Sequence, residues 1–361
     1  MKLLIIAMLF LTHLLQAQNL PKGWPWKGID IMAYAVNSDP QALQFIIDNK
    51  IKYVRIHFHK KKVMQDYNVN GHEALNLNLK WAKEINNKLS LSGIESFITL
   101  ADFPISLKEC INKKDVSYWK NKACIEQMYF DVNKTVQYFK NSTILGYEFL
   151  GEPVVMKNKK AFQPENWRTV FKNFINITRK IDKNKWLFYS PGPLGLPTAY
   201  NKVTPFNDLR IIYNAHMYLP HKYTHQNIEI HENSYVYPGY LRFKKWDKEA
   251  LEKSFLPLIK FQKKYNKPIS ISEFSVVLWA DGSEKYIEDL INIFNKYQWS
   301  WIYFNIGELY KGWDARFDAK LDKLRKKNYT YRGEKSKRFS TLKKYFIVNK
   351  KDNNATSYSR E

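Results

Sequence analysis

Short runs of apolar, β-branched and aromatic residues recur eight times along the chain, separated by longer amphipathic segments. Such runs predict strands, and apolar positions spaced three and four residues apart predict helices. The expected strands occupy residues 27–34, 53–58, 96–104, 144–153, 186–193, 209–218, 268–275 and 299–307. Amphipathic segments between them include residues 39–50, 75–89, 166–181 and 249–265. This alternation indicates a parallel sheet covered by helices.

Eight strand–helix units in a chain of 361 residues predict an α/β fold, namely a single (β/α)8 TIM barrel. An open doubly wound sheet is the structural alternative. Such a sheet usually has a glycine-rich phosphate turn after its first strand, and residues 27–34 lead into no such turn. We therefore expect one barrel domain over residues 18–350.

The first residues have the layout of a secretory signal peptide. Lys2 precedes an apolar run from Leu3 to Leu15, and the small residue Ala17 precedes a polar one. The run is too short to span a bilayer, although a buried strand or an uncleaved anchor remains an alternative. We expect cleavage after residues 1–17, a secreted or periplasmic protein with no transmembrane segment, and a frayed tail over residues 351–361.

Composition adds a large excess of positive charge. The chain has 58 Lys and Arg against 34 Asp and Glu, a net charge of +24, and 45% of its residues are hydrophobic, enough for a sizeable core. Residues 320–351 hold 13 Lys and Arg against 2 Asp and Glu, with apolar residues at helical spacing. We expect an amphipathic C-terminal helix with a solvated basic face. A patch for nucleic acid or an anionic surface is the alternative, but no nucleic-acid-binding signature supports it, and we expect no nucleic-acid partner.

Two cysteines exclude a disulfide-rich scaffold and a four-cysteine zinc site. Cys110 and Cys124 flank a polar stretch, and export would permit a disulfide between them. From the sequence, a disulfide and two free thiols both remain open.

Polar residues mark the ends of the expected strands, where side chains of a barrel point into one bowl. These are His57, Asp102, Glu152, His216 and Tyr218, and Glu273, while Arg55 lies within the second expected strand. A charged residue inside an apolar strand is costly unless it is paired, so Arg55 and Glu273 are expected to be partners. Glu152 and Glu273 lie on strands four and seven, which face each other across a barrel. Two such glutamates can flank a glycosidic bond, one as general acid and the other as nucleophile.

Three segments that contain these residues resemble one protein family. ILGYEFLGEP, HMYLPH and PISISEFS, together with Arg55 on strand two, are similar in order and spacing to the cellulase-like barrels of glycoside hydrolase family 5, a retaining family. The resemblance implies that Glu152 is the acid/base, that Glu273 is the nucleophile and that Arg55 holds the nucleophile's charge. It implies that His216 and Tyr218 line the subsite where the bond breaks, that the substrate is a β-linked glucan or related polysaccharide, and that no cofactor or metal takes part. We expect the chain to act as a monomer.

Two positions depart from the family pattern. Gly151 stands where the family has an asparagine that binds the sugar 2-hydroxyl, and Phe304 aligns with a tryptophan under the reacting sugar. Trp279 and Trp313, in loops over the bowl, are the expected replacement platforms, and Asp102 is a further expected substrate contact. The loss at Gly151 leaves an alternative, a weak or inactive barrel that only binds carbohydrate. His221 and His225 are four residues apart, but no acidic residue completes a zinc motif.

Overall fold

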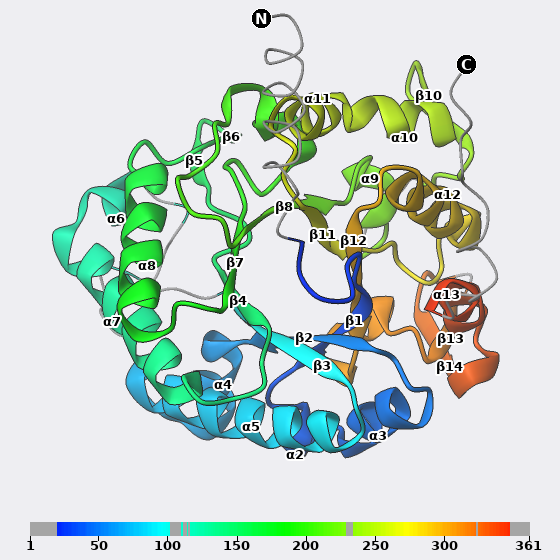
Figure 1. Cartoon of the computed structure of the whole chain (residues 1–361). Coiled ribbons are helices and arrows are strands. Elements are labelled where there is room, and N and C mark those ends of the chain that lie inside the picture. Colours follow the sequence, from blue (N-terminus) through cyan, green and yellow to red (C-terminus); the bar gives the residue numbers. More distant parts are fainter. Residues whose placement is uncertain are drawn as a thin grey trace, which may run out of the picture.

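Eight parallel strands close into a barrel in the computed structural model, as the sequence predicts (Figure 1). The structure describes residues 20–346 apart from 102–109, 111–113, 115, 229–233, 323 and the side chain of residue 308. The expected signal peptide, the expected tail and Asp102 lie outside the described residues. The barrel strands are β1 (Lys27–Met32), β2 (Tyr53–Phe58), β3 (Glu95–Leu100), β4 (Gly146–Phe149), β7 (Trp186–Tyr189), β8 (Ile211–Met217), β11 (Ile269–Phe274) and β12 (Ser300–Ile306).

Each strand pairs with the next one along the chain, and β1 pairs with β12 to close the sheet. Helices ring the barrel on the outside (Figure 1). The helices are α2 (Ala35–Ser38), α3 (Pro40–Asp48), α4 (Lys60–Tyr67), α5 (Gly71–Leu91), α6 (Val116–Lys120), α7 (Lys122–Phe139), α8 (Trp167–Ile181), α9 (His221–Thr224), α10 (Lys248–Ser254), α11 (Leu256–Tyr265), α12 (Ser283–Lys296) and α13 (Lys337–Phe346). Short 3-10 helices are η2 (Pro197–Lys202), η3 (Glu308–Trp313) and η4 (Gly333–Lys335). Among the described helices, none has the length and hydropathy needed to cross a bilayer.

Local sequence explains where several helices begin and end. The side chain of Asn70 accepts from the backbone N–H of Glu73, and Glu73 bonds back to the N–H of Asn70, which forms a capping box at the start of α5. The single amphipathic segment expected over 249–265 is two helices. It breaks at Phe255, and Pro257 lies in the first turn of α11, where a missing N–H costs nothing.

The core has two parts. One large cluster fills the space between the barrel and its helices. A smaller cluster, built around the stacked rings of Phe97 and Phe188, includes Trp26, which directly precedes β1. This position puts the smaller cluster toward the N-terminal ends of the strands, so it plugs the barrel at the end opposite the functional cavity described below.

Three β-hairpins interrupt the strand–helix pattern, and the sequence pattern does not reveal them. They are β5 (Val155–Lys157) with β6 (Lys160–Phe162), β9 (Gly239–Leu241) with β10 (Lys244–Trp246), and β13 (Phe317–Leu321) with β14 (Lys327–Tyr331). The expected C-terminal helix is therefore only part of the basic segment. It is α13, which buries Phe339 and Leu342 against the barrel helices, while residues 320–331 belong to the third hairpin.

The disulfide left open by the sequence forms between Cys110 and Cys124, whose Cα atoms are 5.5 Å apart. Both cysteines are fully buried. The bond ties the connection after β3 to helix α7, next to the C-terminal end of the barrel.

Candidate active site

Arg55 is the centre of a buried charge cluster at the C-terminal end of the barrel. Its guanidinium lies 2.7 Å from Asp30, 2.6 Å from Glu148 and 2.8 Å from Glu273. The expected pairing of Arg55 with Glu273 is thus present. Asp30 is the register partner of Arg55 on the neighbouring strand β1, so strand pairing brings these two together. Three carboxylates accept from the N–H groups of one fully buried guanidinium and thereby fix the orientation of its plane.

Glu273, at the end of β11, has two polar neighbours besides Arg55. The hydroxyl of Tyr218 donates to Glu273 Oε2 at 3.2 Å, and His216 Nδ1 lies 3.6 Å from the same oxygen. Burial, together with Glu273, raises the pKa of Tyr218 well above its usual value, so the phenol remains a donor. The arrangement leaves a nearly buried carboxylate with three donors directed at it.

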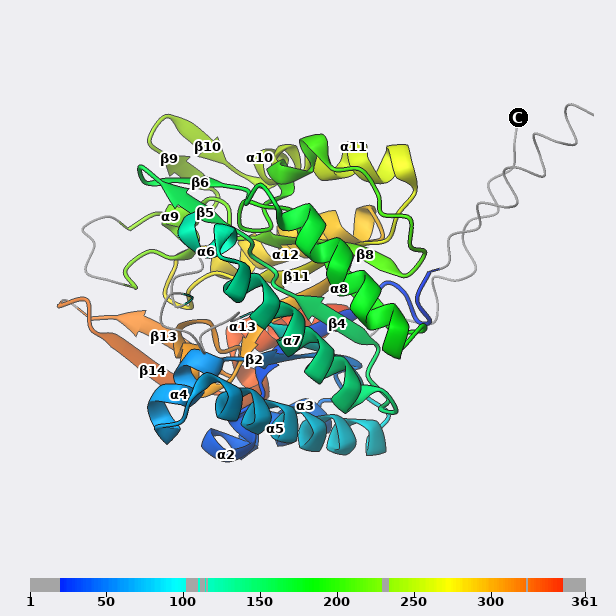
Figure 2. The same cartoon turned by 90° about the vertical axis from the view of Figure 1, so that its left-hand side faces the viewer.

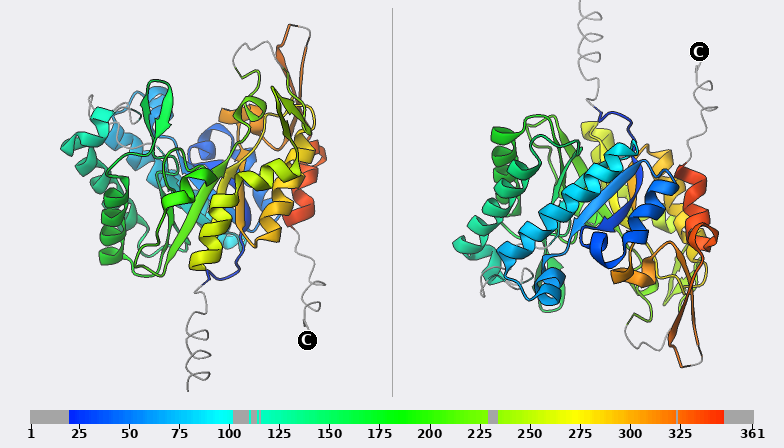
Figure 3. Two further views of the ribbon diagram at one scale, coloured as in Figure 1. Left: turned by 90° about the horizontal axis from the view of Figure 1, so that it is seen from above. Right: turned by 90° about the horizontal axis from the view of Figure 1, so that it is seen from below.

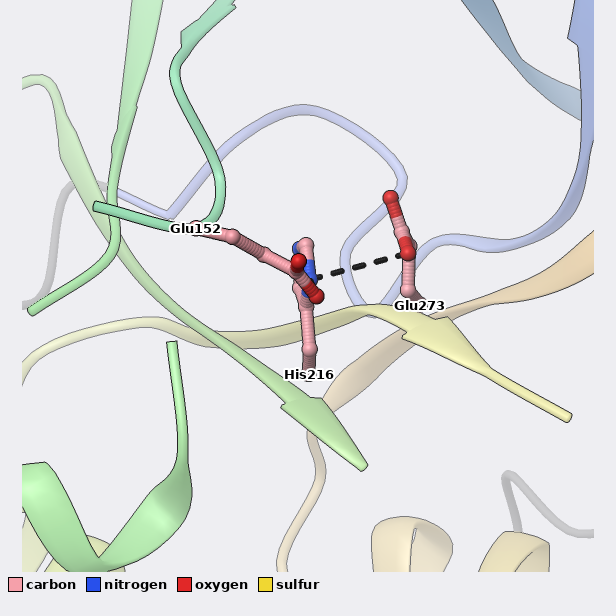
Figure 4. A group of neighbouring side chains, drawn as sticks. All are labelled: Glu152, His216 and Glu273. Atoms are coloured by element: carbon pink, nitrogen blue, oxygen red, sulfur yellow. Dashed lines mark hydrogen bonds and ion pairs between the residues drawn. The ribbon is translucent and has the colours of Figure 1, made fainter. Parts of the chain in front are cut away.

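Glu152 lies in the loop after β4 rather than on the strand itself, and its side chain is 42% exposed. Its Oε1 is 3.0 Å from His216 Nδ1. Oxygens of Glu152 and Glu273 lie within 4.8 Å of each other (Figure 4). That separation fits retaining carboxylate pairs, which are about 5–5.5 Å apart, better than inverting pairs at about 6.5–9.5 Å.

His216, from β8, lies between the two glutamates with its ring directed at both (Figure 4). On its other side, Nε2 faces Glu148 at 3.3 Å and Ser272 at 3.1 Å. Burial alone would lower the pKa of His216, but Glu273, Glu148 and Glu152 outweigh it and raise the pKa to about 10. The ring is therefore an imidazolium at neutral pH.

Asp30, Glu148, Asn214 and Ser272 are polar residues of this cluster that the sequence analysis does not identify. Burial would raise the pKa of Glu148, but Arg55 and His216 hold it well below its usual value. Asn214 Nδ2 donates to Glu148 Oε1 at 2.7 Å, so this amide supports the buried carboxylate instead of replacing the missing asparagine at Gly151. One signal was available, because Glu148 is an acid within the apolar strand β4, four residues before Glu152.

A cavity of about 490 Å³ contains both glutamates, and Trp313, Phe304 and Tyr310 form part of its wall. Trp313 therefore lies where the sequence analysis expects a platform. Trp279 does not line this cavity. Its indole N–H donates to the carbonyl of Gln226, and it lines a separate cavity of about 730 Å³ beside β13 and β14.

Among the described residues, the set close enough to bind one metal ion is Glu152, His216 and Glu273. A metal ligand must offer a lone pair, and the raised pKa of His216 keeps its Nδ1 protonated. His221 and His225 stack on each other at 3.9 Å between ring centroids, and neither belongs to that set. The donor set therefore fits a proton-sharing site better than a metal site.

A (β/α)8 barrel with two opposed glutamates over a buried arginine is the arrangement of barrel glycoside hydrolases. The model of the cellulase family, glycosyl hydrolase family 5, matches residues 17–309, and the chain belongs to this family.

Two curated relatives are similar to part of the chain. Endoglucanase C of Acetivibrio thermocellus is 25% identical over 188 residues, which are 45% of this chain and 53% of the relative. Endoglucanase C307 of Clostridium sp. (strain F1) is 24% identical over 188 residues, with the same coverage. The chain thus spans about half the length of the curated relatives it matches.

Solved structures agree in fold over most of the chain. Endoglucanase Cel5A of Thermotoga maritima superposes with a TM-score of 0.64 at 21% identity, covering 89% of this chain and 97% of that one. The cellulose synthase subunit Z of Clostridioides difficile superposes with a TM-score of 0.61 at 16% identity, covering 90% and 96%. At these identities the likeness establishes the barrel fold alone.

Proposed function

We propose that the protein is a retaining glycoside hydrolase that cleaves a β-linked glucan or a related polysaccharide. The observation that carries the proposal is the pair of glutamates, Glu152 and Glu273, with carboxylate oxygens within 4.8 Å in one open cavity. Membership of glycosyl hydrolase family 5 supports the same reaction class. The endoglucanase names of the curated relatives favour a glucan.

In the first step, Glu273 attacks the anomeric carbon while Glu152 donates a proton to the leaving oxygen, and the glycosidic bond breaks. Arg55 contacts Glu273 Oε1 and Tyr218 donates to Glu273 Oε2, so the two residues together orient the attacking carboxylate. In the second step, Glu152 removes a proton from water, and that water displaces Glu273 from the anomeric carbon. Two inversions at one carbon give net retention.

The wall around the pair is suited to a sugar ring. Flat aromatic faces pack against the C–H face of a pyranose, and we assign this part to Trp313, with Phe304 beside it. His216 would line the same subsite. The two glutamates, Arg55 and Tyr218 meet within one barrel, and we propose that the enzyme acts as a monomer.

We also infer that the protein is exported, after removal of residues 1–17, to the periplasm or the medium. The disulfide between Cys110 and Cys124 supports this inference, because such bonds persist in oxidising compartments.

The test replaces each glutamate in turn and measures release of reducing ends from β-glucan, mannan and xylan. Glu152→Gln is expected to lower the rate by roughly 10²–10⁴-fold, the usual range for loss of general acid–base catalysis. Glu273→Ala should lower it at least as far. Glu249→Gln, at an exposed acid on helix α10, is the matched control and should keep the wild-type rate.

Product stereochemistry separates the two roles. Proton NMR of the wild-type reaction should show the β-anomer first, and azide added to Glu273→Ala should give an α-glycosyl azide. Wild-type rates in both glutamate variants would refute the assignment. If the protein binds these glycans and releases no reducing ends, the alternative of a binding barrel, prompted by Gly151, is favoured.

A further inference from the structure

Three β-hairpins project from the same end of the barrel (Figures 2 and 3). They are residues 155–162, 239–246 and 317–331, and together we call them the hairpin rim. They follow β4, β8 and β12, so all three leave the C-terminal ends of strands, where the cavity with the two glutamates opens.

The hairpin rim concentrates positive charge. The first two hairpins contain three Lys or Arg each and no acidic residue, and the third contains five against two Asp. Each hairpin thus has a net charge of +3. These 31 residues account for +9 of the +24 of the whole chain, although they are less than a tenth of its length.

Most of the described cations of the rim are exposed, and several form no ion pair with a described acidic residue. Lys157, Lys159 and Lys160 on the first hairpin are exposed, and none forms an ion pair with a described acidic residue. On the second hairpin Arg242 is likewise exposed without such a pair. Lys245, next to Asp247 at 3.2 Å, is an exception. Like charges left side by side and unpaired are unfavourable, and a polyanion would relieve them.

Each hairpin also exposes an apolar side chain to solvent. Phe162 is 48% exposed on the first hairpin, Phe243 is 100% exposed on the second and Leu324 is 77% exposed on the third. Aromatic and aliphatic side chains beside cations suit a ligand that offers apolar C–H faces together with anionic groups.

The first and third hairpins are bonded to segments that contribute to the cavity wall, namely Lys114 and the connection after β8 that contains His221 and His225. The backbone N–H of Met156 in β5 donates to the carbonyl of Lys114, a residue that lines the cavity. On the third hairpin, Lys327 Nζ donates to the carbonyl of Ile228 at 2.6 Å and Arg325 donates to Asn227 at 2.9 Å, in the connection after β8. A chain held on the rim would therefore lie close to the glutamate pair.

We propose that the hairpin rim binds an acidic polysaccharide, a β-linked glycan bearing carboxylate or sulfate groups, and holds it across the catalytic cavity. Lys and Arg side chains of the rim pair with the anionic groups, and the apolar tips pack on the sugar rings. This inference rests on the proposed function, and it narrows the substrate class from β-linked polysaccharides in general to negatively charged ones.

An extended polymer fits the geometry better than a flat anionic membrane does. A bilayer seated on three hairpins at the mouth would cover the cavity and block substrate, whereas a polymer chain can lie between the hairpins and still reach the two glutamates. Anionic vesicles therefore serve as an alternative to be tested.

The experiment compares two polymers with the same β-glucan backbone. Carboxymethyl cellulose is anionic and hydroxyethyl cellulose is neutral. Binding is measured on the full-length Glu273→Gln protein, so that no hydrolysis intervenes, by affinity electrophoresis and thermophoresis at 50 mM and 500 mM NaCl. Carboxymethyl cellulose should bind at least about 10-fold more tightly at low salt, and the difference should vanish at high salt because mobile ions screen the pairs.

Charge-neutralised variants locate the effect. The triple variants K157Q/K159Q/K160Q and R242Q/K244Q/K245Q should each weaken binding to carboxymethyl cellulose by at least about fivefold. The matched control, K52Q/K140Q/K183Q, removes three exposed lysines that precede strands β2, β4 and β7 at the opposite end of the barrel, and it should stay within twofold. Phe243→Ala should weaken binding without changing its salt dependence.

Equal binding of the two polymers would overturn the proposal. An equal loss of carboxymethyl cellulose binding in the control variant would also overturn it, because binding would then depend only on the net charge of the protein. Tighter binding to phosphatidylglycerol vesicles than to carboxymethyl cellulose, lost in the rim variants, would make the rim a membrane surface instead. The binding measurement does not depend on catalysis, and hydrolysis of neutral glucans by the wild type tests the proposed function separately.

Discussion

The imidazole of His216 occupies the space that any side chain at Gly151 would need. A Cβ added at Gly151 would lie 2.6 Å from His216 Cε1 and 2.8 Å from Glu148 Oε1, closer than such contacts occur. The space that an asparagine side chain at position 151 would need is therefore filled by His216 and Glu148. Gly151 thus allows the ring of His216 to pack between Glu152 and the buried Glu148.

We expect Gly151→Asn, which restores the family residue, to be destabilising in this chain. The new side chain must displace His216 or Glu148, and overpacking of this kind costs about 1–3 kcal/mol. Urea unfolding monitored by fluorescence should give the difference in free energy of unfolding. The rate on β-glucan should fall with it, because His216 is moved away from Glu152.

A double-mutant cycle tests the cause. If His216 is the obstacle, Gly151→Asn combined with His216→Ala should be less destabilised than the sum of the two single variants. Additive losses would mean that the asparagine is excluded by something other than the ring.

Arg55 provides a second prediction, because it is fully buried among Asp30, Glu148 and Glu273. Arg55→Met leaves these carboxylates without their cation, and removing one partner of a buried ion pair costs about 3–5 kcal/mol. Arg55→Lys keeps the charge but loses the planar fork, so its loss of stability should be smaller. Chemical unfolding of the three proteins should rank them wild type, Arg55→Lys, Arg55→Met. An Arg55→Met protein as stable as the wild type would contradict the assignment of Arg55 as the centre of the cluster.

The barrel could be predicted from the sequence because each strand is a short, buried run of apolar, β-branched and aromatic residues. The C-terminal ends of the strands in such a barrel surround one cavity, so polar residues there are expected to meet. The sequence predicts Glu273 and His216 for that reason, and it predicts Arg55 because a charged residue inside an apolar strand needs a partner. Glu148 was missed because it lies inside β4, where alternation directs it to the barrel interior, and Glu152 drew attention by its neighbour Pro153.

Loops were predictable only in part. The hairpin strands β5, β6, β9 and β10 have three residues each, too few for a periodic signal. Trp279 and Trp313 both follow barrel strands, and the sequence offers no way to tell which reaches the glutamates. The answer depends on tertiary packing, since the Trp279 indole is fixed by Gln226 and by the third hairpin.

The disulfide gives a third prediction. Cys110 and Cys124 close a short loop, and in the chain-entropy model a loop of about 15 residues contributes about 3 kcal/mol. The C110S/C124S variant should lose about this much free energy of unfolding relative to the oxidised wild type. Dithiothreitol should lower the stability of the wild type and leave the variant unchanged. An equal response of both proteins to the reductant would contradict a structural role for the bond.

The charge state of His216 predicts how stability depends on pH. Its pKa is about 10 in the folded protein, against an ordinary value of 6.5, because Glu273, Glu148 and Glu152 surround it and outweigh the effect of burial. A raised pKa means that folding favours the protonated ring. The stabilisation that the protonated ring gives to the folded state is therefore complete below about pH 6.5. It declines as the pH rises above that value and is lost once the pH has passed about 10.

The comparison of wild type with His216→Gln isolates this contribution from the titration of lysines and tyrosines, which both proteins share. The free energy of unfolding should differ most at pH 6, and the difference should shrink steadily between pH 7 and pH 10. Ser272 and Glu148 remain on the Nε2 side in both proteins, so the change reports the ring alone. A difference that is constant from pH 6 to pH 10 would mean that His216 is neutral in the folded state, and the ring would then hold Glu152 by a hydrogen bond without a charge.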